Sequence, residues 1–114
     1  VGIAPTTIIG MTRVGTGMMV TLLRLTIEEF DIVFNALLKW GIDPDDEGSS
    51  KLKNAYDVQN IATHEAGHAV GLDDLYEDPY RELTMYGKSS KGETIKISLE
   101  QGDKAGTQYP YGGL

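Results

Sequence analysis

Apolar residues recur at intervals of three and four positions between residues 56 and 71, and this period predicts an amphipathic helix. Asp57 is a suitable N-cap, because a carboxylate can accept a hydrogen bond from a free N–H group of the first turn. Gly71 stands where a left-handed residue would end the helix. Four apolar residues share one face of this helix and are expected in the core: Val58, Ile61, Ala62 and Ala69.

The first third of the chain is apolar and interrupted, and most of it predicts strands. Residues 6–14 mix β-branched residues with Gly10, which predicts a strand with a bulge at the glycine. Residues 15–17, Gly-Thr-Gly, predict a turn. Residues 18–25 fit a helix or a strand equally well. Residues 30–34 alternate large apolar residues with others, which predicts a strand.

The last third is rich in turn residues. Residues 83–87 predict a short turn, and a final helix is expected from Ser98 or Leu99 to about Tyr109, because Pro110 follows. The pattern as a whole predicts one α+β domain over residues 1–114. Its expected parts are strands and a loop (1–56), a helix (57–71), and a turn with a final helix (72–114).

The composition narrows the range of functions. Ten Lys+Arg against seventeen Asp+Glu give a net charge of −7, and the positive residues form no basic patch. Binding to nucleic acid or to an anionic membrane is therefore not expected. No apolar stretch is long enough for a membrane span, so membrane insertion is not expected either. The lack of cysteine excludes a disulfide framework, a thiolate zinc site and a cysteine nucleophile.

An acidic loop over residues 43–50 partly matches the start of a calcium-binding loop. Asp43, Asp45 and Glu47 stand at alternate positions, but the twelfth position is Asn54, where a bidentate Glu is expected. We interpret the segment as a solvated acidic loop. Calcium is therefore only weakly supported as a cofactor, and no residue is assigned to it.

The residues that carry chemistry are concentrated in the segment 64–74, HEAGHAVGLDD. His64 and His68 are four apart on the predicted helix, so both rings project from one face and can bind one zinc ion. Glu65 would lie beside the metal without ligating it. From there its carboxylate can take a proton from a water that zinc activates.

A catalytic zinc site needs a third protein ligand and an open position. The chain has only two histidines, so the third ligand must be a carboxylate. Gly71 allows a sharp turn that returns the chain toward the metal. Asp74 fits the spacing best, and Asp73 is the alternative.

This segment resembles the extended motif HExxHxxGxxH of the metzincin metallopeptidases, with Asp74 in place of the third histidine, as in the snapalysin type. Residues 83–87, Leu-Thr-Met-Tyr-Gly, resemble the Met-turn of these enzymes. The resemblance implies that Met85 lies beneath the zinc as a hydrophobic floor. Tyr86 follows it as in matrixins, and Gly87 stands where other metzincins place a tyrosine ligand, so no such ligand is expected.

Other segments are similar to a matrixin catalytic domain. Residues 29–35 resemble the strand before the active-site helix, and residues 8–12 resemble the edge strand that pairs with substrate. Residues 99–106 are similar to the last helix, with Gly102 at a position that is usually Asp, so a buried hydrogen bond to the Met-turn is expected to be missing. The substrate-binding residues that the resemblance implies are Ile9, Gly10, Met11 and Tyr86.

The resemblance implies a metzincin-like (zincin) catalytic domain of the α+β class. Its expected parts are a twisted, mostly parallel sheet with an antiparallel edge strand, an active-site helix, a Met-turn and a C-terminal helix. The strands and long helix that begin this domain in the family have no counterpart here. We therefore expect a compact variant or a fragment lacking N-terminal elements, and a truncated sheet would favour self-association through its exposed edges.

The resemblance thus implies a secreted zinc-dependent endopeptidase that hydrolyses internal peptide bonds of proteins. It would use one catalytic Zn²⁺, held by His64, His68 and Asp74, with Glu65 as the catalytic carboxylate. The alternative is a catalytically inactive, zinc-binding structural or peptide-binding module with a degenerate protease fold. A third reading is a metal-free acidic domain with a chance motif.

Overall fold

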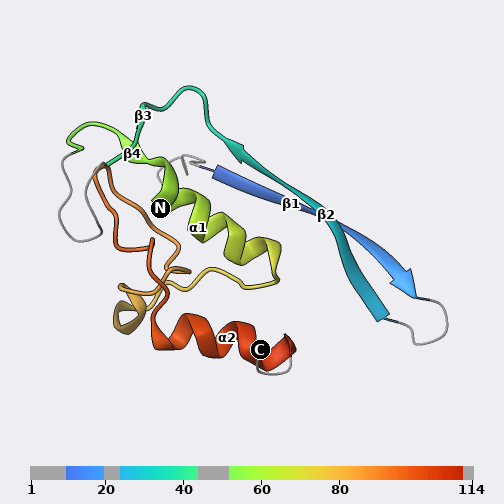
Figure 1. Ribbon diagram of the computed structural model, residues 1–114. Coiled ribbons are helices and arrows are strands. Elements are labelled where there is room, and N and C mark those ends of the chain that lie inside the picture. Colours follow the sequence, from blue (N-terminus) through green and yellow to red (C-terminus); the bar gives the residue numbers. More distant parts are fainter. Residues whose placement is uncertain (1–9, 20–23, 44–51, 112–114) are drawn as a thin grey trace.

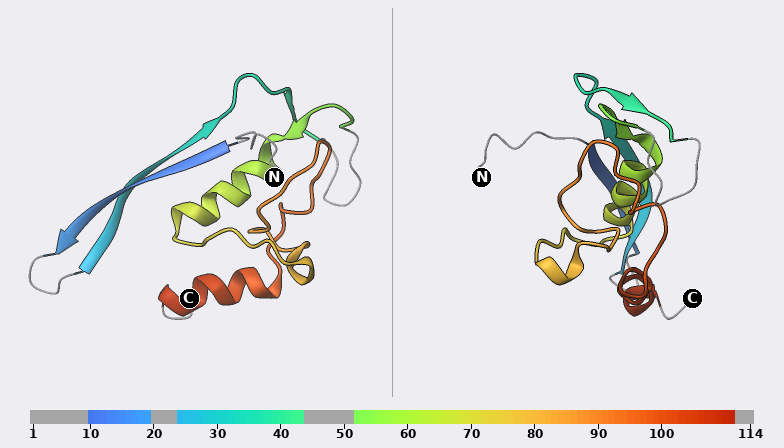
Figure 2. Two further views of the ribbon diagram at one scale, coloured as in Figure 1. Left: turned by 180° about the vertical axis from the view of Figure 1, so that it is seen from behind. Right: turned by 90° about the vertical axis from the view of Figure 1, so that its left-hand side faces the viewer.

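A long antiparallel hairpin and two helices organise the chain in the computed structural model, which describes residues 10–19, 24–43 and 52–111 (Figure 1). Strand β1 (Gly10–Met19) pairs with β2 (Arg24–Phe34) from Gly10↔Phe34 to Met19↔Arg24. The end of the hairpin at Met19 and Arg24 projects away from the helices in Figure 1 and in the left view of Figure 2. The other end of the hairpin, where β1 begins, lies against helix α1 (Val58–Ala69), which carries the two histidines.

The hairpin corrects two predictions for the first third of the chain. Residues 15–17 lie inside β1 instead of forming a turn, and the register shifts between Gly15 and Thr16. The bulge predicted at Gly10 is absent, since Gly10 pairs in register with Phe34. A glycine-rich run thus marks an irregular point of a long strand here, because β2 supplies partners for its backbone groups. The strand predicted at residues 30–34 is confirmed as part of β2.

A second, much shorter pairing leads the chain into the first helix. Strand β3 (Trp40–Gly41) runs parallel to β4 (Tyr56–Asp57), and helix α1 (Val58–Ala69) follows at once. Trp40 packs edge-on against Phe34 at 4.9 Å between ring centroids, which ties this pairing to the end of β2. In the described ranges the parallel pairing is confined to β3–β4 and the long pairing is antiparallel. The α+β class is confirmed, and so is the antiparallel strand over the described part of β1.

Helix α1 packs against the start of the hairpin on one side and against the chain from residues 72 to 103 on the other (Figure 1). The apolar core is small: Ala55, Ile61, Ala69 and Met85 are buried. Most of the other buried side chains are polar, and these include Asp57, Asn60, Thr84, Lys96 and Asp103. The region around α1 is therefore held by buried hydrogen bonds as much as by apolar packing.

The C-terminal part is irregular until the last helix. A single 3-10 turn, η1 (Asp78–Tyr80), interrupts the loop after α1, and helix α2 covers Gln101–Tyr111. The predicted start at Ser98 or Leu99 is too early, because the Glu100 N–H donates to the Asp103 carboxylate at 2.8 Å, as at a helix N-terminus. The predicted end at Tyr109 is too early as well, since Pro110 lies within the last turn.

Candidate metal centre

Helix α1 places the two histidines as the sequence predicts. Asp57 caps its N-terminus by accepting a hydrogen bond from the Asn60 N–H at 2.8 Å. His64 and His68 lie one turn apart on one face, with ring centroids 4.8 Å apart and the ring planes at 89°. His64 is buried and His68 is half-buried. Two imidazoles are thus presented side by side from a rigid element.

The chain turns back toward these rings directly after the helix. Gly71 has a φ of 99°, a left-handed backbone conformation that residues other than glycine adopt rarely. The turn brings Asp74 Oδ1 to 3.0 Å from His64 Nε2 and 3.2 Å from His68 Nε2. Asp73, the alternative third ligand, is exposed and lies outside this cluster.

Hydrogen bonds at the other ring nitrogens fix the tautomers of both histidines. His64 Nδ1 lies 2.7 Å from the Thr84 carbonyl oxygen, and His68 Nδ1 lies 2.7 Å from the Leu72 carbonyl oxygen. Because a carbonyl can only accept, each Nδ1 carries the proton and donates it. In a neutral ring with the proton on Nδ1, Nε2 presents its lone pair, and in both histidines this atom faces Asp74 Oδ1.

Three candidate ligand atoms consequently converge on one point. Asp74 Oδ1 is buried and accepts no hydrogen bond within the described part of the chain. With both rings neutral, its short contacts to the two Nε2 atoms join acceptor to acceptor, and a cation between them would remove this repulsion. The three ligand atoms lie within 4.8 Å of one another, so one ion can contact all of them. Two neutral imidazoles and one carboxylate are a donor set that suits Zn²⁺.

A tyrosine that the sequence analysis did not identify contacts the outer oxygen of this carboxylate. The Tyr76 hydroxyl donates to Asp74 Oδ2 at 3.3 Å, and the Tyr76 ring lies close against Gly87, where a β-carbon would be 2.4 Å from Tyr76 Cε1. Burial, with smaller contributions from the charge of Asp74 and the hydrogen bond to it, raises the pKa of Tyr76 above its usual value. The phenol therefore stays protonated and available as a donor. Its position two residues after Asp74 is the only sequence signal for it.

The turn predicted at residues 83–87 lies against the same helix. Met85 is buried, and its sulfur packs on the backbone of Gly67, between the two histidines in sequence. The Thr84 N–H donates to both carboxylate oxygens of Asp103, at 3.0 and 3.1 Å. The buried hydrogen bond expected to be missing because of Gly102 is thus present, since the neighbouring Asp103 makes it.

Glu65 lies on the side of α1 that faces the hairpin. It is buried, and a β-carbon placed on Gly10 would lie 3.1 Å from Glu65 Oε1. Gly10 at the start of β1 is therefore the part of the predicted substrate-binding edge that lies against the Glu65 carboxylate. Met11 follows in β1, and Ile9 lies outside the described residues. Tyr86, the other predicted substrate-binding residue, is half-buried and belongs to the turn at residues 83–87.

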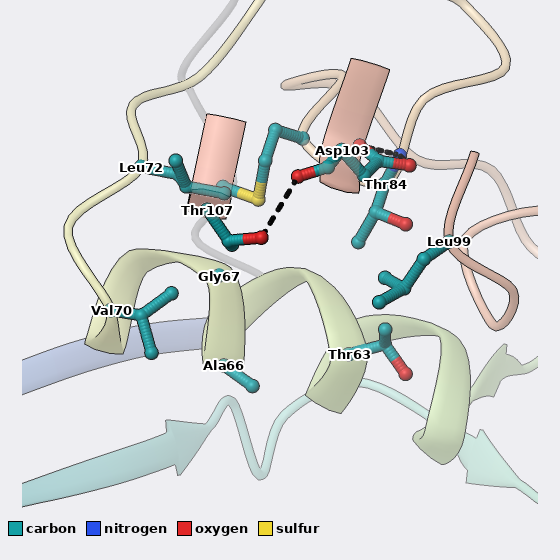
Figure 3. Close-up of a pocket in the computed structure, with 10 residues that line it drawn as sticks. Thr63, Ala66, Gly67, Val70, Leu72, Thr84, Leu99, Asp103 and Thr107 are labelled. Atoms are coloured by element: carbon teal, nitrogen blue, oxygen red, sulfur yellow. Dashed lines mark hydrogen bonds between the residues drawn. The ribbon is translucent and has the colours of Figure 1, made fainter. Parts of the chain in front are cut away.

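A largely apolar cavity of about 260 Å³ lies between α1 and α2 (Figure 3). Thr63 and Ala66 line it from α1, Val70 lines it from the C-cap of that helix, and Asp103 and Thr107 line it from α2. Neither the two histidines nor Glu65 nor Asp74 lines it. The cavity is therefore no part of the candidate centre.

A helix with two facing histidines, a converging carboxylate and a buried methionine packed on Gly67 is the arrangement that the resemblance to metzincins implies. The model of the Matrixin family matches residues 24–112, and the chain belongs to this family. Matrixins are metallopeptidases that use zinc, and this membership confirms the resemblance seen in the sequence. No solved structure matches the chain.

Two curated plant proteins are similar to part of the chain. Metalloendoproteinase 4-MMP of Arabidopsis thaliana is 34% identical over 73 residues, which cover 64% of this chain and 19% of that protein. Metalloendoproteinase 1-MMP of the same species is 37% identical over 73 residues, which cover 64% of this chain and 18% of that protein. The chain thus matches about a fifth of the length of these relatives.

Proposed function

We propose that this domain is a zinc-dependent endopeptidase, with His64, His68 and Asp74 as the metal ligands. The observation that carries the proposal is the convergence of both histidine Nε2 atoms on a buried carboxylate oxygen that accepts no hydrogen bond from the described residues. Membership in the matrixin family and the similarity to two plant metalloendoproteinases support it. When bound, zinc would supply a Lewis acid that activates water and polarises the carbonyl of the substrate.

The protein's own residues have distinct tasks in this hydrolysis. Glu65 takes a proton from the attacking water as the water oxygen bonds to the carbonyl carbon, and it delivers that proton to the amine nitrogen as the C–N bond breaks. The carbonyls of Thr84 and Leu72 hold the two imidazoles in the required tautomer. Tyr76 holds the outer oxygen of Asp74. An extended substrate would lie along the start of β1, next to Gly10 and Glu65.

The test combines zinc content with proteolysis. Purified protein is loaded with zinc, dialysed and measured by elemental mass spectrometry, and hydrolysis of casein is followed with and without a chelator. We expect about one zinc per chain and cleavage that the chelator abolishes. Glu65→Gln should retain the zinc and lose cleavage, whereas Glu29→Gln, an exposed carboxylate on β2, should retain both. Zinc binding without cleavage would favour the alternative, an inactive zinc-binding module, and lack of zinc would contradict both.

The resemblance also implies that the protein acts outside the cell, and we propose this location on that ground alone. None of the described helices is long and apolar enough to cross a membrane. Secretion of a tagged full-length protein into the culture medium would test the location.

A further inference from the structure

The cavity between α1 and α2 has an apolar lining that comes from several parts of the chain (Figure 3). This part of the lining consists of Ala66, Gly67, Val70, Leu72, Met85 and Leu99. The volume of the cavity is about 260 Å³. An apolar cavity of about 150 Å³ is enough to bind benzene. A single aromatic ring with a short substituent therefore fits in this space.

The polar side chains of the lining are already engaged within the protein. The hydroxyls of Thr63 and Thr107 donate to carbonyl oxygens of their own helices, at 2.8 and 2.9 Å. The Thr84 hydroxyl donates to the Lys96 carbonyl at 3.1 Å, and the Thr84 N–H donates to both carboxylate oxygens of Asp103. A cavity holds ordered water only where polar groups have hydrogen bonds to spare. This cavity therefore suits an uncharged apolar molecule better than water.

Two residues of the lining also orient the candidate metal ligands. The Thr84 carbonyl accepts from His64 Nδ1, and the Leu72 carbonyl accepts from His68 Nδ1, each at 2.7 Å. The cavity thus shares with the candidate centre the two segments that hold its imidazoles, although none of the ligands lines it. A molecule packed against Thr84 and Leu72 would restrict the motion of both carbonyls. It would therefore reduce the cost of ordering the two imidazoles when zinc binds.

We propose that this cavity binds a small uncharged apolar molecule, a single aromatic ring or a short alkyl chain, and that its occupation strengthens zinc binding. The site is separate from the expected place of a peptide substrate, because neither Glu65 nor Gly10 lines it. The coupling to zinc rests on the proposed metal ligands, whereas the binding of the apolar molecule does not. Because coupling between two sites is reciprocal, zinc must strengthen the binding of the apolar molecule by the same factor.

Toluene is the probe, and isothermal titration calorimetry measures its binding to the full chain with and without zinc. We expect saturable binding, and a zinc affinity that is about fivefold higher in saturating toluene, measured by competition with a chelator. Toluene should bind more tightly to the zinc-loaded protein by the same factor, and burial of its surface should give a negative heat-capacity change. Benzoate has the same ring with a carboxylate in place of the methyl group. It should not bind, because burying an unpaired charge is costly.

Variants that fill the cavity place the binding. Ala66→Leu fills it from α1 and keeps the helix, because leucine has nearly the helix propensity of alanine. Thr107→Leu fills it from α2, and it keeps the test decisive if the first variant does not fold. Both variants should bind zinc but no toluene, so that toluene no longer changes their zinc affinity. Ala105→Leu, at an exposed alanine of α2 outside the lining, is the matched control and should behave as the wild type does.

Several results would overturn this inference alone. They are a lack of toluene binding, toluene binding that leaves the zinc affinity unchanged, binding that persists in both filled variants, and benzoate binding as tight as that of toluene. A wild-type dimer in sedimentation that Ala66→Glu dissociates would assign the cavity to a second copy of the chain and overturn the inference as well. Lack of zinc binding by the wild-type protein, by contrast, overturns the proposed function and the coupling together.

Discussion

The backbone of Gly67 and the sulfur of Met85 are in such close contact that a β-carbon built on Gly67 would lie 2.2 Å from Met85 Sδ. Glycine in the middle of a helix costs about 1 kcal/mol relative to alanine. This cost is offset here because only glycine lets the buried methionine approach the helix between His64 and His68. Gly67, which lies between the two histidines in sequence, and Met85 are therefore the two sides of one packing contact.

This contact predicts that Gly67→Ala displaces Met85 and strains the segment that holds His64 in place. We expect a loss of about 1–3 kcal/mol in the free energy of unfolding, measured by urea denaturation of the metal-free protein. Gly106→Ala on α2 is the control, because its β-carbon would meet only the flexible end of Leu72. In the double variant Gly67→Ala/Met85→Ala the two effects should be less than additive, because the clash is removed. Full additivity would contradict the proposed packing.

The features that the sequence predicted correctly are local. Asp57 caps α1 because a carboxylate at that position can reach the first turn, and Gly71 ends it because the turn needs a positive φ. The helical period places His64 and His68 on one face whatever the rest of the chain does. These signals depend on residues within a few positions of each other, so one sequence is enough to detect them.

The features that the sequence did not predict depend on distant partners. Residues 15–17 continue β1 because β2 pairs with them, and a Gly-Thr-Gly run alone indicates a turn. Lys96 would normally be assigned to the surface, and its burial follows only from Glu93 and the Lys88 carbonyl. Tyr76 contacts Asp74 because the loop folds over Gly87. Contacts of this kind require the tertiary structure.

Asp74 and Asp73 form a natural pair for testing the third ligand. Asp74→Ala should weaken zinc binding more than about 100-fold, beyond the usual effect of residues that only support a ligand. Asp73→Ala should leave it unchanged, because Asp73 is exposed and outside the cluster. Competition with a chromophoric chelator gives both affinities. The reverse order would assign the ligand role to Asp73.

Asp74→Ala should also leave the metal-free protein at least as stable as the wild type. In the absence of a cation and with both rings neutral, Asp74 Oδ1 faces two nitrogen lone pairs and accepts no hydrogen bond from the described residues. Its removal eliminates this repulsion. Thermal unfolding of the metal-free variants measures the effect, and a clear loss of stability would contradict the assignment of the tautomers.

The hydrogen bond from Tyr76 should support the metal through Asp74. Tyr76→Phe removes the hydroxyl group and keeps the ring on Gly87, so the fold should be retained. We expect zinc affinity to fall about tenfold, the lower end of the range for residues that orient a ligand. Tyr80→Phe is the matched control, since that tyrosine is also partly exposed. Equal affinities in the two variants would show that the 3.3 Å contact does not orient the carboxylate.

The buried carboxylate of Asp103 should be important for stability. It accepts from the Thr84 N–H with both oxygens and from the Glu100 N–H with one, so it connects the start of α2 to the methionine turn. Asp103→Asn replaces an acceptor by a donor and should cost about 1–3 kcal/mol in the free energy of unfolding. Asp78→Asn, which breaks an exposed ion pair with Arg81, should cause no measurable change in urea denaturation. Similar losses of stability in both variants would contradict the importance of the hydrogen bonds to Asp103.

Gly10 and Glu65 allow the role of the buried carboxylate to be tested without removing it. A β-carbon on Gly10 would lie 3.1 Å from Glu65 Oε1 and 3.1 Å from Ile61 Cγ2, so Gly10→Ala must displace the Glu65 side chain by a few tenths of an ångström. The proposed metal ligands lie at other positions of α1 and in the following loop, so zinc content should stay the same. Because proton transfer depends steeply on geometry, we expect kcat to fall by about tenfold. Stopped assays on a peptide substrate give kcat, and elemental analysis gives the zinc content. A wild-type kcat together with a wild-type zinc content would mean that Glu65 does not depend on the start of β1 for its position.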